Sequence, residues 1–182
     1  TKMVAINTRI CFFPEKMFFN TNTGDVGSLS ASAVAENITV TVTTSTLSVP
    51  AGAGLSFSGL FKPDDIVQVT ASDSKLNVSA VVKAVSENEI TFPDETFIDL
   101  VASGETSAEI SVSSIKFERG CPDLDYVMES NNRLWGVSNK DNTIYACKLG
   151  DPTNWQYFQN TAVDSYYAEQ GTDGEWTGCA AY

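Results

Sequence analysis

The sequence predicts an all-β protein, in which an antiparallel β-meander arranged as partial β-propeller blades carries an inserted small β-barrel. Three observations lead to this prediction. Short runs that alternate apolar and polar residues recur along the chain, and turn residues separate them. No segment has the pattern of a long helix. The aromatic residues are distributed very unevenly.

The uneven aromatic content divides the chain into three segments. All three Trp, all six Tyr and all four Cys lie outside residues 31–118, whose only aromatic residues are five Phe. This middle segment holds twelve acidic and four basic residues and is dominated by Ser, Thr, Val and Ala. Segments that differ this much are expected to have separate cores. We therefore expect residues 1–30 and 119–182 to be two parts of a propeller-like host domain, with 31–118 inserted as a small β-barrel.

Short strands separated by turns are expected throughout the insert. Pro50–Gly54 should end the preceding strand. Lys62–Asp65 should form a turn, because Pro fixes φ and the Asp side chain can accept a hydrogen bond from the nearby backbone. Strands this short and frequent favour a small closed barrel over an open sheet. Six or seven short strands are expected, over residues 37–49, 66–72, 76–86, 90–94, 95–101 and 108–118, with the run 55–61 leading into the turn at Lys62–Asp65.

The host segments should form a meander with a strand about every ten residues. Asp173-Gly174 suits a two-residue hairpin turn, and Asp141-Asn142 is a weaker version of that signal. Small residues such as Gly136 beside large aromatic residues suit sheets stacked face to face, as in propeller blades. Strands are expected over residues 8–13, 16–20, 125–130, 133–138, 143–149, 155–159, 165–170 and 176–182.

These eight strands correspond to two four-stranded blades, whereas a closed propeller has at least four. We therefore expect the chain to be a fragment of a longer polypeptide, or to be completed by other chains.

Composition excludes several classes of function. The net charge of −12 leaves no basic surface for nucleic acid or an anionic membrane. No apolar run approaches the roughly 20 residues of a membrane span, and the first residues do not resemble a signal peptide. The absence of His removes Ser-His and Cys-His nucleophile pairs and His-based metal sites. The four Cys have no CxxC spacing, so reduced, half-buried thiols are expected. A single disulfide between two of them is the alternative.

No catalytic, cofactor or metal site is predicted. The carboxylates at Asp123, Asp125, Asp141, Asp151 and Glu175 could serve a glycosidase, but solvated turn residues are the favoured interpretation. A sialidase-type Asp-box matches poorly from Ser138 onward, and Asp123-Leu124-Asp125 lacks the neighbours of a Ca²⁺ loop.

Exposed aromatic residues at loop ends could stack on sugars. Trp155 and Trp176 are the candidate glycan contacts, although packing between blades is the favoured interpretation for both, as it is for Trp135. The sequons at Asn37 and Asn77 carry little meaning without a secretory signal.

Several motifs resemble a family of tailed-bacteriophage and prophage virion proteins. They are RICFFPEKMFFNTNTGDVGSL, NNRLWGVSNKDNTIYACKLGDPTNW and DSYYAEQGTDGEWTGCAAY, with GLFKPDDIVQVTASDSKLNVSAVVKAVSENEITFPDETF between the first two. The resemblance covers nearly the whole chain and rests on the order and spacing of the motifs. It implies a propeller-like β body with a small barrel, and it brings no catalytic residues. This chain is much shorter than a complete family member.

The resemblance leads to a functional expectation. It implies a non-enzymatic structural protein of the phage tail or baseplate, a β scaffold that presents an appended domain. A carbohydrate-binding host-receptor module is the first alternative, and a glycan hydrolase is the second. The expected partners are other virion proteins in an oligomeric assembly. A host cell-surface glycan is the further partner that the carbohydrate-binding alternative would require. The expected location is the virion, after synthesis in the bacterial cytoplasm.

Overall fold

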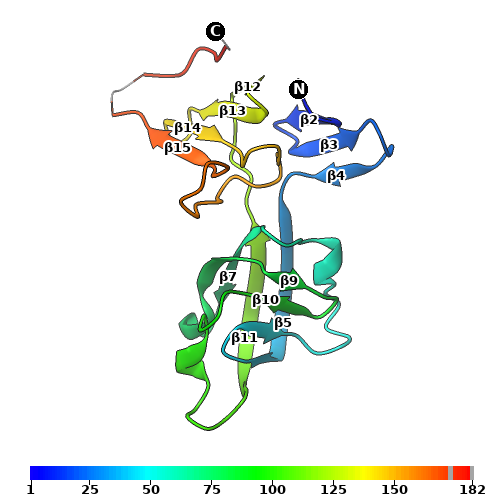
Figure 1. The fold of residues 1–182 in the computed structure, drawn as a ribbon, viewed down its shortest axis with the longest axis vertical. Coiled ribbons are helices and arrows are strands. Elements are labelled where there is room, and N and C mark those ends of the chain that lie inside the picture. Colours follow the sequence, from blue (N-terminus) through cyan, green and yellow to red (C-terminus); the bar gives the residue numbers. More distant parts are fainter. Residues whose placement is uncertain (172–173, 181–182) are drawn as a thin grey trace. The chain divides into compact units, whose positions relative to one another are not determined.

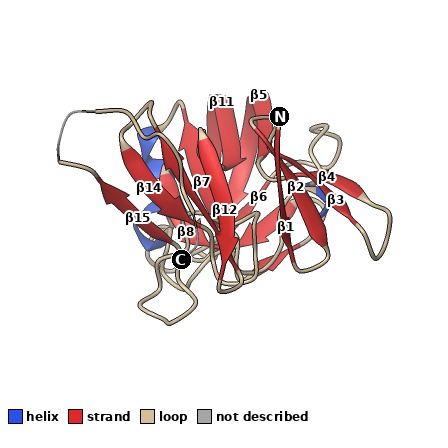
Figure 2. Cartoon of the chain, turned by 90° about the horizontal axis from the view of Figure 1, so that it is seen from above, coloured by secondary structure: helices blue, strands red, loops and turns tan. Residues whose placement is uncertain are grey.

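Strands make up nearly all the regular structure of the protein (Figure 2), in a computed structural model that describes residues 1–171 and 174–180. These residues include no α-helix, and their sheets are antiparallel, so the predicted all-β class is confirmed. The short helices are the 3-10 turns η1 (Phe57–Gly59), η2 (Ser74–Leu76) and η3 (Ile98–Leu100). The chain divides into two compact units, one formed by Thr1–Ser30 with the segment from Gly120 onward, and the other by Ala31–Arg119.

The first unit contains two four-stranded sheets, each a meander in chain order (Figure 1). The N-terminal sheet consists of β1 (Lys2–Ile6), β2 (Arg9–Phe13), β3 (Met17–Asn20) and β4 (Val26–Ser28). The C-terminal sheet consists of β12 (Tyr126–Ser130), β13 (Arg133–Ser138), β14 (Thr143–Ala146) and β15 (Tyr166–Glu169). Strands β1 and β4 were not expected from the sequence.

Asparagine forms the tight turns of these meanders. Asn131 and Asn132 both have positive φ, at 52° and 59°, and they join β12 to β13 in the way that a two-residue type I′ turn requires. The predicted turn at Asp141-Asn142 does join β13 to β14, but as part of a four-residue loop that begins at Asn139. Asp173 of the other predicted turn lies outside the described residues.

One core joins the two sheets of the first unit. The register places Ile6, Cys11 and Phe13 on one face of the N-terminal sheet, and Leu134 on the corresponding face of the C-terminal sheet. The Phe13 and Trp155 rings meet edge to face, with centroids 6.4 Å apart. We call these the inner faces, since they pack against each other.

The second unit is built on a seven-stranded sheet in the order β8-β7-β11-β5-β6-β10-β9. Its longest ladder pairs β5 with β11 from Ala31 opposite Arg119 to Val42 opposite Ala108, so the two ends of the insert are cross-strand neighbours. The strands are β5 (Ala31–Val42), β6 (Thr46–Ser48), β7 (Ile66–Ala71), β8 (Val78–Val81), β9 (Ala84–Val85), β10 (Glu89–Thr91) and β11 (Ala108–Arg119).

The sheet of the second unit rolls up without closing through hydrogen bonds among its described strands. Its two outermost strands, β8 and β9, are separated in sequence by only Val82 and Lys83. The Val82 amide donates to the Asp65 carbonyl, and the Lys83 amide donates to the Thr91 carbonyl. Both edges of the sheet therefore come together at this two-residue link, around a single apolar core.

Three predicted strands are wrong. Residues 95–101 contain η3, because Glu95 has a positive φ of 65° and the following amides bond back three residues. Residues 155–159 lie in an irregular loop between β14 and β15. The described part of 176–182 is not a strand. Apolar content alone suggested strands in these places, and local hydrogen bonding prevails in the first two.

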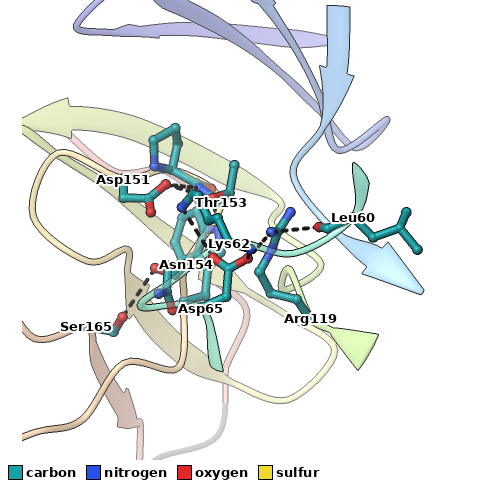
Figure 3. Close-up of polar contacts among 10 residues, drawn as sticks. Leu60, Lys62, Asp65, Arg119, Asp151, Thr153, Asn154 and Ser165 are labelled. Atoms are coloured by element: carbon teal, nitrogen blue, oxygen red, sulfur yellow. Dashed lines mark hydrogen bonds and ion pairs between the residues drawn. The ribbon is translucent and has the colours of Figure 1, made fainter. Parts of the chain in front are cut away.

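A buried ion pair lies near the end of β11 (Figure 3). Asp65 is 0% exposed, and its carboxylate accepts hydrogen bonds from the guanidinium of Arg119 and from the backbone amide of Lys62. The Lys62 ammonium lies 3.2 Å from the same carboxylate, and Arg119 also donates to the Leu60 carbonyl. Such a site tolerates its charges because each one has a partner.

Replacing Asp65 by Asn should destabilise the second unit by about 3–5 kcal/mol, because Arg119 would be left as a buried charge without its counterion. The measurement is urea unfolding followed by far-UV circular dichroism. The urea midpoint followed by tryptophan fluorescence should be unchanged, since all three Trp belong to the first unit. The matched control is Glu36→Gln, which removes an exposed carboxylate from β5. Equal urea midpoints for the two variants would contradict the assignment.

Candidate functional site

Trp155, a candidate glycan contact, is an anchor of the loop between β14 and β15. Its side chain is 2% exposed, and its indole N–H donates to the Pro152 carbonyl at 2.8 Å. With the Phe13 ring against it, no face of the indole is open for stacking on a sugar. The glycan contact at this residue stays a prediction, and binding there would require the loop to open.

Arg133, which the sequence did not single out, fastens the same loop. Its guanidinium donates to the carbonyl oxygens of Cys147, Ala162 and Asp164, at both ends of the loop. The Asp164 carboxylate in turn accepts hydrogen bonds from Thr161 and from two nearby backbone amides, which lower its pKa. No sequence signal marked Arg133, because its partners are backbone carbonyls far along the chain.

Short polar contacts stabilise the inside of the loop (Figure 3). Asp151 accepts hydrogen bonds from the backbone amide and the hydroxyl of Thr153, at 3.1 and 2.7 Å. The Ser165 hydroxyl donates to the Asn154 carbonyl at 3.2 Å. Asp151 is therefore a turn-forming residue in this structure.

A small pocket of about 140 Å³ adjoins the loop. It is lined by Gly120, Cys121, Pro122, Tyr145, Trp155 and Gln156. Burial, with help from a hydrogen bond to Asp141, raises the pKa of the Tyr145 phenol to about 12. The volume is below the roughly 300 Å³ at which sites for small-molecule ligands begin.

The remaining candidate carboxylates, apart from Glu175, also make structural contacts. Asp123 pairs with Lys140 and Lys16, and these hydrogen bonds lower its pKa to about 2. Asp125 accepts from the Asn139 amide at 2.6 Å, and Glu175 is exposed. The structure thus assigns positioning roles to carboxylates that could have served as an acid-base pair.

Within the described residues, no group of three or more Cys, Asp or Glu side chains is placed to hold a metal ion. None of their helices is long and apolar enough to cross a bilayer.

Trp176, the other candidate glycan contact, is half-buried near the end of β13. Its backbone amide donates to the Asn139 side-chain oxygen at 2.6 Å, and the Asn139 amide group donates back to its carbonyl at 3.4 Å. Trp135 is also half-buried, with its ring centroid 5.8 Å from that of Tyr166. The structure does not bring Trp155 and Trp176 together into one aromatic platform.

The four cysteines, all of which lie among the described residues, form no disulfide with one another. Cys11, Cys121 and Cys147 lie in the core between the two sheets of the first unit. Burial raises the pKa of Cys147 to about 12 and that of Cys11 to about 11, which makes both thiols poor nucleophiles at neutral pH.

The outer face of the N-terminal sheet is apolar from one edge to the other. Met3 and Val26 are 70% and 68% exposed, although they lie on strands of a packed domain. Apart from Ser28, every strand position on this face is apolar. The apolar residues are Met3, Ala5, Ile10, Phe12, Met17, Phe19 and Val26.

The outer face of the C-terminal sheet has the same character. Tyr166 is 48% exposed, Val137 and Ala146 in the middle of the face are buried already, and the other apolar residues are half-buried. Ser130 and Arg133 are the polar residues, and both lie at one end of the face. The apolar residues are Tyr126, Met128, Trp135, Val137, Ile144, Ala146, Tyr166 and Ala168.

Comparison of the chain with protein-family models, curated proteins and solved structures finds no match. Among the described residues, the two apolar outer faces are the feature that bears most directly on function.

The packing at Gly136 can be tested directly. A Cβ atom there would lie 2.6 Å from a methyl group of Leu124 and 3.0 Å from the Tyr126 carbonyl, so Gly136→Ala should destabilise the first unit by about 1–3 kcal/mol. Urea unfolding followed by tryptophan fluorescence measures the change. The control is Gly178→Ala, where the new methyl group meets no atom within 4 Å. A Gly136→Ala variant as stable as this control would refute the close approach.

Proposed function

We propose that this chain is a non-enzymatic structural protein of a bacteriophage tail or baseplate. In this proposal the two sheets of the first unit are blades of a propeller-like body, and the second unit is a barrel-like domain that the body presents. The proposal joins the motif resemblance to the geometry of the first unit.

The observation that carries the proposal is the packing of two four-stranded meanders that both have apolar outer faces. Adjacent propeller blades pack face to face, with the first strand of each meander near the axis. Here the inner faces share one core, and β1 lies beside β12, the first strand of the other sheet. A blade in the interior of an assembly needs apolar residues on both faces, and each of these sheets has them.

The second unit supports the idea of a presented domain. The meeting of β8 and β9 at a two-residue link is what a nearly closed barrel would produce. Twelve acidic residues against four basic ones over residues 31–118 favour a solvated surface that repels its own copies. Its adjacent ends allow it to be carried by the body without interrupting the body's core.

A structural role also agrees with the use of the carboxylates. Asp123, Asp125 and Asp151 hold turns or pair with lysines, and a glycosidase would need two of them facing a substrate instead. A glycan hydrolase therefore ranks below a structural role.

The proposal is tested by looking for the protein in particles. Phage particles released by cells that carry the gene are purified on a density gradient and analysed by mass spectrometry. Peptides from both units should be found in a fixed ratio to a tail protein across the particle peak. A soluble host protein of similar abundance serves as the control, and it should be lost on purification. Absence of the chain from intact particles would refute the structural role.

Carbohydrate binding is the second candidate, favoured by an exposed aromatic pair rather than by the predicted tryptophans. The Phe158 and Tyr167 rings lie on the surface with centroids 5.6 Å apart. Aromatic rings exposed together in this way are suited to stacking on sugar rings.

If the chain binds glycans through this pair, it should be retained on cell walls of the host bacterium, and Tyr167→Ala should reduce the retention at least several-fold. Sedimentation of the protein with purified walls measures this. Val34→Ala, at an exposed position of the second unit, is the control. Equal retention of the wild type and Tyr167→Ala would exclude this pair as the site.

A further inference from the structure

We infer that the outer face of the N-terminal sheet binds the outer face of the C-terminal sheet of another copy, so that the protein closes into a ring. This inference rests on the blade-like arrangement proposed above, but not on the viral role. The occupant of each outer face is a second copy of this chain.

The first unit itself shows what covers a face of these sheets. The inner face of the N-terminal sheet, with Ile6 and Cys11, packs directly against the inner face of the C-terminal sheet, with Leu134. The outer faces are the opposite sides of the same two sheets. A second copy can therefore continue the stack, with its N-terminal sheet on the C-terminal sheet of the first copy.

The placement of charge on the strands supports association rather than exposure to water. On the N-terminal sheet, Lys2 and Arg9 lie on the inner face, while the outer face has no charged residue. On the C-terminal sheet, Glu129 and Glu169 share the inner side. A solvated antiparallel sheet has polar residues on its outer side, whereas the charged strand residues of these two sheets, apart from Arg133, lie on the inner side, beside the apolar core.

The one charge on the outer faces is already engaged. Arg133 lies at the end of the C-terminal outer face, and its guanidinium donates to three backbone carbonyls of the following loop. When a partner covers the face, the guanidinium therefore keeps these hydrogen bonds in place of the water that it loses. Met3 and Val26, at 70% and 68% exposure, would gain most from being covered.

The size of each face favours a ring over an open pair. Four strands about 4.8 Å apart and about five residues long give a footprint of roughly 300 Å². A stable interface takes about 800 Å² from each partner, so one such contact is weak alone. In a closed ring each copy makes two contacts and leaves neither outer face uncovered. Propellers typically have four to eight blades, which corresponds to two, three or four copies with two sheets each.

The test is the mass of the chain in solution, measured by native mass spectrometry and light scattering over a range of concentrations. The wild type should form one closed species of two to four copies. Met3→Glu on the N-terminal outer face and Tyr166→Glu on the C-terminal outer face should each reduce it to monomers, because every contact needs both faces. Val34→Glu, an exposed apolar position of the second unit, should leave the ring intact.

Two outcomes of this experiment would overturn the inference. A wild type that stays monomeric at all concentrations excludes the ring. A Met3→Glu or Tyr166→Glu variant that remains a dimer shows that each face binds its own kind. Circular dichroism and tryptophan fluorescence establish that the variants are folded, and Val26→Glu replaces Met3→Glu if that variant unfolds. A monomeric chain found in phage particles would overturn the ring alone, whereas a ring absent from particles would overturn the viral role alone.

Discussion

The packing of one sheet face on another is the constraint on which the first unit depends. Its two sheets are short, and neither could bury a core alone. They come from the two ends of the sequence, and about ninety residues of insert separate them. They can share a core because Ala31 and Arg119 are cross-strand partners, so the chain leaves the first unit and returns to it at neighbouring points. The β5–β11 ladder holds the two ends of the insert side by side, so the two flanking sheets can form the core around Phe13 and Trp155 despite the insertion.

The same constraint explains which parts of the fold could be predicted from the sequence. Strands with clear alternation were found, and β13 has the predicted bounds Arg133–Ser138. The aromatic content changes near the positions where the two compact units divide, since a core with its own aromatic residues leaves a compositional signature. Strand β1 was missed because both of its faces are largely apolar, which conceals the alternation. Residues 155–159 were mistaken for a strand because their aromatic residues anchor a loop instead.

The candidate site was much less predictable, for a different physical reason. Trp155 was selected as an aromatic residue at the end of a loop, but its burial depends on Phe13, which is more than a hundred residues away in sequence. Arg133 binds backbone carbonyls, which every residue has, so no pattern of side chains identifies its partners. The apolar outer faces emerge only when the register of all eight strands is known, because each strand contributes only one or two apolar residues to them.

The pairing of Ala31 with Arg119 also has a mechanical consequence. A pull transmitted through the host chain enters the insert at one end of the β5–β11 ladder and leaves it at the same end. The ladder is then loaded one hydrogen-bonded pair at a time, so that it opens like a zipper, and not in shear along its whole length. Because the insert connects two sheets that pack against each other, tension reaches the ladder only after the core around Phe13 and Trp155 has separated, and unzipping then lengthens the chain between the sheets.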